Sequence, residues 1–348
     1  MVAAPGRTGT ASRWLVTPDR LVGIGRAPAR MVLAGLLMAV LAAAVFVPAA
    51  ITPPEFLHDA IVATLRHGGD YYDAARDLLR TEPDARAARA LPSTLAVVAA
   101  ALPAWGLTAL VAAGLTMLLW IGGLRLGGLL ARSAGALLIV SLLGFGIVAT
   151  AALWLAAPHA AAAALLSAIA LVARARGRVT AAVAVACAAA LIDPAALVTL
   201  ATMGAMALLD GDRREPLLWL VGFGVAALAF TMHLQALGPT PAPSAPLVAD
   251  RALARLMGAA FPDVPAAIAA PLVVLAAFGW STVTDPLGLR VMALLVAGVA
   301  LDGVLGWRSA TLAVPLVAPG LALVPAAVAT LARAALDRRR ITVTRVTR

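Results

Sequence analysis

The residues best suited to chemistry gather in one polar stretch, residues 55–89, of a chain that is otherwise almost continuously apolar. The stretch covers about a tenth of the length, yet it holds 12 of the 44 charged residues, seven carboxylates beside five arginines. Apolar runs long enough to cross a membrane precede and follow it. Carboxylates at a membrane surface can exchange protons there, and guanidinium groups can bind phosphates. We therefore expect a functional site in this stretch.

Two amphipathic helices are predicted within the stretch, over 59–66 and 70–80, separated by the glycine pair Gly68-Gly69. In the second helix the apolar positions recur at three- and four-residue spacing, at Tyr71, Ala74, Ala75, Leu78 and Leu79. A helix with this pattern lies along the membrane interface rather than across it.

Each candidate residue in these helices also has a structural interpretation. Asp70 follows the glycine pair and is placed to cap the second helix, and Asp59 stands at the start of the first. Asp73 is spaced for an ion pair on a solvated helix face. Tyr71 and Tyr72 are the only tyrosines, and tyrosine rings suit the headgroup region as plain anchors.

Composition places the whole chain in the membrane class. It is 62% hydrophobic and 13% charged, with a mean hydropathy of +0.96, whereas soluble domains carry about 25% charged residues. All 27 basic residues are arginines spread over loops between apolar runs, which favours membrane anchoring and excludes nucleic acid as a partner. The single cysteine, Cys187, excludes an intrachain disulfide.

The predicted fold is all-α, a polytopic transmembrane helix bundle of about ten spans, some short or broken, with interfacial helices in the first outer loop. The spans are expected at about 31–52, 105–123, 133–156, 160–173, 179–191, 195–209, 217–236, 265–284, 290–306 and 311–332. A short segment at 91–102 and an amphipathic piece at 250–261 stay on the outer side. The transmembrane domain covers 31–335, including the outer loop 53–104, between a basic N-terminal segment, 1–30, and a basic tail, 336–348.

Arginine counts set the predicted orientation. This layout places 19 arginines on the inside and 8 on the outside. By the positive-inside rule both termini are cytoplasmic, and we expect a multi-pass protein of the bacterial inner (plasma) membrane.

Two further ionisable residues are expected at outer helix ends. His159 follows Pro158 and would face the same side as the polar stretch, although an interfacial histidine is often inert. Asp193 lies between apolar residues, where an unpaired carboxylate is costly, so it should face a cavity or an arginine. The alternative is a cap for a helix starting at Pro194. Asp302, six residues before Arg308, has the same two interpretations.

The residues Asp70 to Leu79 resemble, with one residue fewer between the aspartate and the tyrosine, the pattern Asp-x-x-Tyr-x-Ala-Ala-x-x-Leu-Leu that follows the first helix in some GT-C-type membrane glycosyltransferases. The long first outer loop and the segment at 91–98, LPSTLAVV, are similar too. The resemblance implies transfer of a sugar, hexosyl or pentosyl, from a polyprenyl-phosphate donor to an extracytoplasmic acceptor, with inversion. Carried over by position, the catalytic base is Asp70.

The physical chemistry agrees with this expectation. A carboxylate must take the proton of the acceptor hydroxyl, and guanidinium groups match the oxygens of a leaving phosphate. The substrate-binding candidates are Asp59, Arg66, Tyr71, Tyr72, Asp73, Arg89, His159 and Asp193. A divalent metal held by Asp70 and Asp73 is the alternative to the arginines, and no other cofactor is indicated.

Departures from the family pattern leave other functions open. Ala90 stands where relatives carry an arginine, and Asp193-Pro194 replaces an Arg-Glu pair. The alternative function is therefore a non-catalytic GT-C-like partner of the proteins that assemble an envelope glycan. A small-molecule transporter is disfavoured, because the charges collect at span ends rather than in matching halves near mid-membrane.

Overall fold

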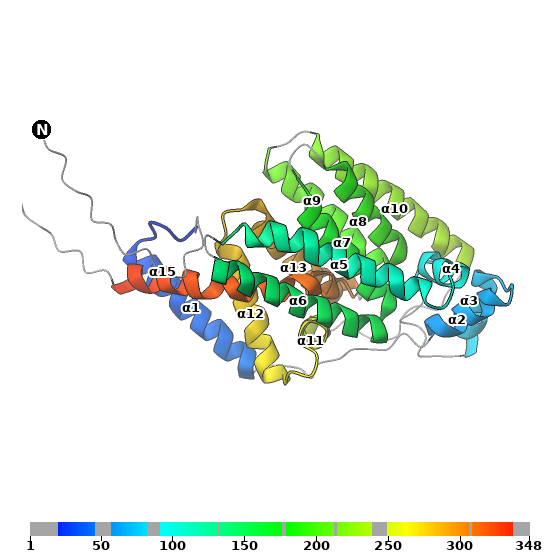
Figure 1. The fold of residues 1–348 in the computed structure, drawn as a ribbon, viewed down its shortest axis with the longest axis horizontal. Helices are drawn as coiled ribbons and strands as arrows, with labels where there is room; N and C mark the ends of the chain where they lie inside the picture. Colours follow the sequence, from blue (N-terminus) through cyan, green and yellow to red (C-terminus); the bar gives the residue numbers. More distant parts are fainter. Residues whose placement is uncertain are drawn as a thin grey trace, which may run out of the picture.

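Every regular element among the described residues is helical, which confirms the predicted all-α class. The computed structural model describes residues 20–45, 57–81, 91–130, 133–175, 179–211, 214–238, 249–305 and 308–336. Two parts of the predicted outer loop, 53–56 and 82–90, and the basic tail from 337 lie outside these ranges. Figure 1 shows a bundle with the helices of the polar stretch gathered at one end.

The ten predicted spans correspond to helical segments of two lengths. Six are long and apolar enough to cross a membrane: α1 (Arg26–Val45), α5 (Gly106–Gly127), α6 (Ser133–Ala156), α10 (Glu215–Leu237), α13 (Pro286–Leu305) and the segment Ser309–Leu336. Four are shorter: α7 (Pro158–Ala173), α8 (Thr180–Ile192), η2 (Pro194–Ala196) continuing into α9 (Leu197–Leu209), and α12 (Ala266–Thr282).

Length separates these two groups physically. The 16 residues of α7 reach about 24 Å at 1.5 Å per residue, short of the ~30 Å hydrocarbon core of a bilayer. By length and composition the chain is thus a multi-pass membrane protein with six candidate spans among its described residues. The predicted count of ten is not confirmed.

Contacts between charged residues show which helix ends lie together. Arg26 at the start of α1 donates to the carbonyl of Ala335 near the end of α15 (Val324–Leu336), with Nε and O 3.2 Å apart. Arg125 near the end of α5 pairs with Asp285, just before α13, at 3.3 Å. We call this the arginine end of the bundle; its described arginines include Arg20, Arg26, Arg30, Arg125, Arg174 and Arg290.

The first helix begins earlier than the predicted residue 31. α1 starts at Arg26, so part of the basic N-terminal segment is helical. Both Arg26 and Arg30 donate through Nε to the carbonyl of Ala335. A guanidinium that binds a carbonyl near the end of another helix satisfies an acceptor that has no intrahelical partner.

The last predicted span, at about 311–332, is a broken helix. It is divided into η3 (Ser309–Ala313), α14 (Val314–Val317) and η4 (Ala318–Leu323) before α15 begins. Irregular backbone at membrane depth is tolerated where protein shields it, and these pieces are buried. A Cβ atom on Gly279 of α12 would lie only 2.0 Å from the carbonyl oxygen of Gly320, so this packing requires glycine.

The amphipathic piece predicted at 250–261 forms a helix inside the bundle. α11 (Ala249–Ala260) packs against α12, α13, η3 and α6. Its residues Ala252, Ala254, Leu256 and Met257 are fully buried. An amphipathic helix in this position turns a charged side chain, Arg255, toward the interior rather than toward the membrane surface.

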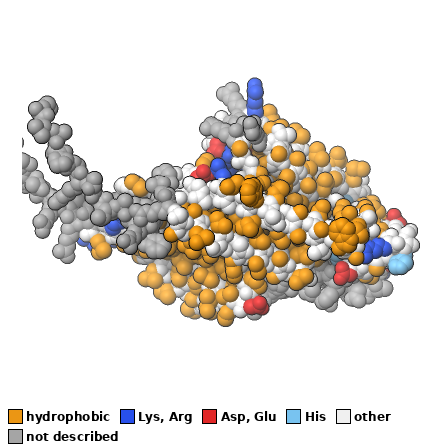
Figure 2. Space-filling view, in the orientation of Figure 1, with side chains coloured by type: hydrophobic (Ala, Val, Ile, Leu, Met, Phe, Trp, Pro, Cys, Tyr) orange, Lys and Arg blue, Asp and Glu red, His pale blue; other side chains and the backbone are white. Residues whose placement is uncertain are grey.

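The surface agrees with a membrane environment. Figure 2 shows hydrophobic side chains over most of the described surface on this face, with charged side chains toward its margins. On α10, for example, Leu217, Leu220, Val221, Leu228 and Met232 are all more than half exposed. Lipid tails are a suitable neighbour for such a face.

Candidate functional site

The helices of the polar stretch form a small unit with its own core. α2 (Leu57–Arg66), α3 (Tyr71–Thr81) and α4 (Thr94–Ala101) pack around Ile61, Val62, Tyr71, Ala75, Ala96 and Ala99. α2 and α3 agree with the predicted helices at 59–66 and 70–80, and α4 is the predicted short segment. Gly68 turns the chain between α2 and α3 with a φ of +84°, a conformation that favours glycine. We call this the first-loop unit.

Asp70, the predicted base, caps α3. Its Oδ1 accepts hydrogen bonds from the backbone N–H groups of Tyr72 at 2.8 Å and Asp73 at 3.1 Å. These groups belong to the first turn of the helix, where backbone donors have no intrahelical partner. The side chain is exposed. The capping interpretation is thus confirmed, and a catalytic role for the same carboxylate stays a prediction.

The two tyrosines fasten α3 to its surroundings. The buried Tyr71 donates its hydroxyl to the carbonyl of Leu91 at 2.7 Å, and burial raises the pKa of this tyrosine. The Tyr72 hydroxyl lies 3.4 Å from Nδ1 of His233, in the last turns of α10, and the two rings are 5.7 Å apart. The two tyrosines therefore bind α3 to the segment before α4 and to α10, in addition to any anchoring at headgroup depth.

His233 is a residue that the sequence interpretation missed. It is buried, and its ring also lies near those of Tyr71 and Phe230. Its Nε2 is buried and has no hydrogen-bond partner among the described residues. The signal was present, because a histidine within an apolar helix is costly and marks a position worth inspection.

The remaining candidates of the first-loop unit lie on its exposed side. Asp73 pairs with Arg76 at 2.9 Å, with both side chains well exposed, as the structural interpretation predicts. Arg66 donates to the carbonyl of Ala99 at 3.1 Å and so links α2 to α4. Asp59 is exposed in the first turn of α2. Arg89 lies outside the described residues.

A pair of histidines joins the first-loop unit to the bundle. The ring of His58 in α2 meets that of His159, in the first turn of α7, edge to face at 5.0 Å. Both side chains are buried. The predicted placement of His159 on the side of the polar stretch is thus confirmed, and its ring neighbour His58 was not among the predicted site residues.

Asp193 lies within the bundle and caps η2. Its Oδ1 accepts a hydrogen bond from the backbone N–H of Ala195 at 2.9 Å, and the residue is buried. η2 packs against α7 and η3. The structure therefore confirms the predicted cap at Pro194. It places this carboxylate in the protein interior, outside the first-loop unit to which Asp70 belongs.

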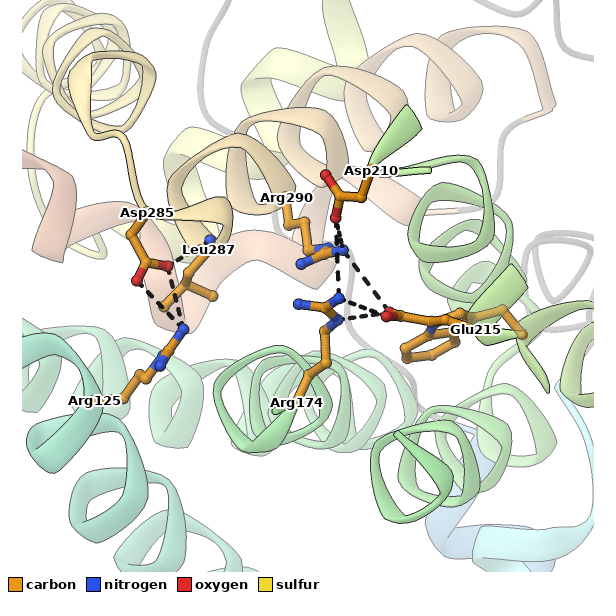
Figure 3. A network of polar contacts seen from close by, with 8 residues as sticks. Arg125, Arg174, Asp210, Glu215, Asp285, Leu287 and Arg290 are labelled. Atoms are coloured by element: carbon orange, nitrogen blue, oxygen red, sulfur yellow. Dashed lines mark hydrogen bonds and ion pairs between the residues drawn. The ribbon is translucent and has the colours of Figure 1, made fainter. Parts of the chain in front are cut away.

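A network that the sequence did not predict occupies the arginine end (Figure 3). Arg174, after α7, binds both carboxylate oxygens of Glu215, at 2.6 Å from Nε and 2.5 Å from Nη2. Arg290 of α13 binds Asp210 at 2.5 Å and lies 3.8 Å from Glu215. The sequence analysis only counted these arginines among those on the inside, whereas the structure shows that Arg290 and Glu215 are buried.

The first-loop unit and the arginine network lie at opposite ends of the bundle. Glu215 and His233 belong to the same helix, and 18 residues at 1.5 Å each separate them by about 27 Å. His159 and Arg174 mark the two ends of α7. We call the end near His159 and His233 the first-loop end.

The first-loop end offers an exposed carboxylate, two tyrosine rings and buried histidines. These groups can accept a proton from a hydroxyl and bind a polar ligand. Among the described residues, no group of three or more His, Cys, Asp or Glu side chains is arranged to hold a metal ion. Comparison with protein-family models, with curated proteins and with solved structures found no match in any of the three.

Proposed function

We propose that the chain is a membrane glycosyltransferase of the GT-C type, taking a sugar from a polyprenyl-phosphate donor at its first-loop end. The observation that carries the proposal is the position of Asp70. This carboxylate is exposed at the start of α3, on a unit of three helices that covers the end of the bundle opposite the arginine network.

The proposed mechanism assigns one step to Asp70. The carboxylate takes the proton of the acceptor hydroxyl as that oxygen attacks the anomeric carbon, and the donor's phosphate leaves with the bonding electrons. The configuration at the sugar is inverted. The tyrosine contacts to Leu91 and His233 hold α3, and with it Asp70, in a fixed place.

The proposed location follows from the distribution of arginines. The arginine end faces the cytoplasm of a bacterial cell, and the first-loop end faces the extracytoplasmic side, where lipid-linked sugars present their headgroups. The positive-inside rule supports this orientation, since described arginines at one end join α1, α5, α7, α13 and α15.

The Asp70→Asn variant tests the proposal sharply. Asparagine caps a helix about as well as aspartate, so α3 should persist while the general base is lost. We expect sugar transfer from lipid-linked donors, assayed in membranes of a host without this activity, to fall by about 10²- to 10⁴-fold. The matched control is Asp77→Asn, an exposed carboxylate paired with Arg80 on the same helix, which should leave transfer unchanged. Full activity of Asp70→Asn would remove Asp70 from the mechanism.

A specific observation also favours the second candidate, a non-catalytic partner of an envelope glycan assembly. Two of the predicted site carboxylates, Asp70 and Asp193, serve as helix caps. Asp193 also replaces the arginine of the family's Arg-Glu pair. If neither the wild type nor the Asp70→Asn variant transfers sugar, while deletion of the chain disrupts glycan assembly, the partner function is the correct one.

A further inference from the structure

The arginines at the arginine end have two kinds of partner. Arg174 and Arg290 bind carboxylates that lie elsewhere in the chain. Arg26 and Arg30, in the first two turns of α1, pair with no carboxylate in the part of the chain that the structure describes. Each donates one hydrogen bond, through Nε, to the carbonyl of Ala335 in α15. The pair therefore carries two positive charges with no counter-charge from the described residues.

A single oxygen atom brings these two guanidinium groups together. Nε of Arg26 and Nε of Arg30 both lie 3.2 Å from the carbonyl oxygen of Ala335, so the two nitrogen atoms can be no farther apart than twice this distance. Like charges this close repel each other, and the repulsion is stronger beside hydrocarbon than in bulk water. An anion that contacts both groups offsets this repulsion.

Capping of α15 does not account for two arginines. The carbonyl of Ala335 is among the last four of the helix, which have no intrahelical partner, and one N–H donor is enough to satisfy it. The end of a helix carries only about half a negative charge, so most of the positive charge of the pair is not offset by it. Each guanidinium has five N–H donors and uses one on the carbonyl, which leaves four for a ligand.

The packing beneath the pair fixes its geometry. Ala29, between the two arginines in the sequence, is fully buried and packs with Leu331 and Ala335 of α15 in a small core of their own. Positions four apart lie on one face of a helix, so Arg26 and Arg30 flank the same seam between α1 and α15. Figure 1 shows these two helices meeting at the end of the bundle away from the first-loop unit.

The surroundings of the pair indicate a lipid as the source of the anion. Met31, the residue after Arg30, is 66% exposed, and Leu37, Met38 and Val45 along α1 are also more than half exposed. An apolar surface therefore begins directly beside the two guanidinium groups. An anionic phospholipid has the same arrangement, with a phosphate at the membrane surface and acyl chains beneath it, and basic sites between transmembrane helices bind such headgroups. A free phosphate ion has nothing to contact the apolar surface.

We propose that Arg26 and Arg30, held over the seam between α1 and α15, form a binding site for the phosphate of an anionic phospholipid. The site is separate from Asp70 and the first-loop unit, and lipid binding does not depend on the proposed sugar transfer. The bound lipid stabilises the packing of α1 against α15, because it binds the folded arrangement in which the two guanidinium groups converge.

Titration of the purified full chain in detergent with phosphatidylglycerol tests the proposal. Phosphatidylcholine with the same acyl chains and soluble glycerol 3-phosphate are the comparisons. Native mass spectrometry counts the bound lipid, and the melting temperature is measured at each concentration. We expect saturable binding of phosphatidylglycerol with a rise in melting temperature. Phosphatidylcholine should bind at least about 10-fold more weakly, and glycerol 3-phosphate should have no effect.

Substitution of the two arginines tests the site itself. Glutamine removes the charge and keeps an N–H donor for the carbonyl of Ala335. Arg26→Gln and Arg30→Gln should each weaken phosphatidylglycerol binding by about 5-fold, and the double variant by about 30-fold, as expected for one arginine and two at an anionic surface. Arg30→Lys, which keeps the charge and loses the fork, should fall between the wild type and Arg30→Gln. The rise in melting temperature with lipid is compared within each variant, so a less stable variant still reports on binding.

The matched control is Arg333→Gln. Arg333 is an exposed arginine near the end of α15, and its Nε donates to the carbonyl of Ala329 in its own helix. This variant should bind phosphatidylglycerol as the wild type does. Equal losses in Arg333→Gln and Arg30→Gln would reveal a diffuse effect of surface charge and overturn the site. Equal binding of the two lipids, an unchanged affinity of the double variant, or saturation by glycerol 3-phosphate would also overturn the proposal.

Discussion

The two ends of the bundle satisfy their polar groups in different ways. At the arginine end, guanidinium groups meet carboxylates from other helices, as in the two-point contact of Arg174 with Glu215. In the first-loop unit, side chains bind mainly backbone groups, as Asp70 and Tyr71 do, or aromatic neighbours. The arginine network therefore holds helices together that are distant in the sequence, whereas the first-loop unit is held mainly by contacts among its own residues.

The largest expected effect is at the arginine end. Glu215→Ala removes the carboxylate shared by Arg174 and Arg290 and leaves the buried guanidinium of Arg290 and the partly buried guanidinium of Arg174 without it. Breaking a buried ion pair on one side costs about 3–5 kcal/mol. We expect this loss in the free energy of unfolding, measured by denaturation of the purified chain in detergent.

Arg125→Ala is the matched control. It breaks the pair with Asp285 and leaves the carboxylate of Asp285 to cap α13 through the N–H of Leu287; the Arg125 side chain is 41% exposed, and exposed pairs contribute about 0–1 kcal/mol. Equal destabilisation by the two variants would contradict the view that burial gives the Glu215 network its structural role.

A smaller, local effect is expected in the first-loop unit. Asp70→Ala removes the cap of α3, which costs about 1 kcal/mol, and Asp70→Asn should keep most of it. Because α3 belongs to the first-loop unit, we expect faster hydrogen exchange in residues 71–75 of the alanine variant and no change at the arginine end. Exchange that rises throughout the bundle would show that the two ends are coupled.

Alkaline pH should loosen the first-loop unit through Tyr71. Burial raises the pKa of this tyrosine, so the docked form holds the phenol proton more tightly than an undocked form with the ordinary pKa of about 10. The contribution of Tyr71 to docking is therefore complete below pH ~10 and is lost as the pH rises through the folded pKa.

The chain contains only two tyrosines, so tyrosinate absorbance in the near ultraviolet reports on this unit alone. The difference between the wild type and Tyr71→Phe gives the titration of Tyr71. We expect its midpoint above pH ~10. A midpoint at or below that value would show that the hydroxyl is not held by Leu91 in solution.

The sequence predicted helix positions well because apolar run lengths and turn residues determine them locally. The span at 133–156 agrees with α6, and the glycine pair marks the turn between α2 and α3. The partners of individual side chains were not predictable in this way. Contacts such as Tyr72 with His233, 161 residues apart, depend on which helix faces meet, and helices that are apolar on all sides give no periodic signal of that.

The same reason explains the missed ion pairs. Asp193 and Asp302 were recognised as costly carboxylates, but the sequence could not tell a cap from a pair. The structure gives Asp193 the cap of η2 and gives Asp302 the partner Arg255. The sequence analysis placed Arg255 in an outer amphipathic piece. Its pairing with Asp302 was not predictable, because a polar helix face can turn toward a polar interior as well as toward water.

The central claim, that the first-loop end faces the outside of the cell and the arginine end the cytoplasm, is tested most directly by thiol labelling. In a Cys187→Ala background, Asp59→Cys and Arg125→Cys each place one thiol at opposite ends. A membrane-impermeant maleimide applied to intact cells should label Asp59→Cys and should label Arg125→Cys only after lysis. Labelling of Arg125→Cys in intact cells, with Asp59→Cys protected, would contradict the account.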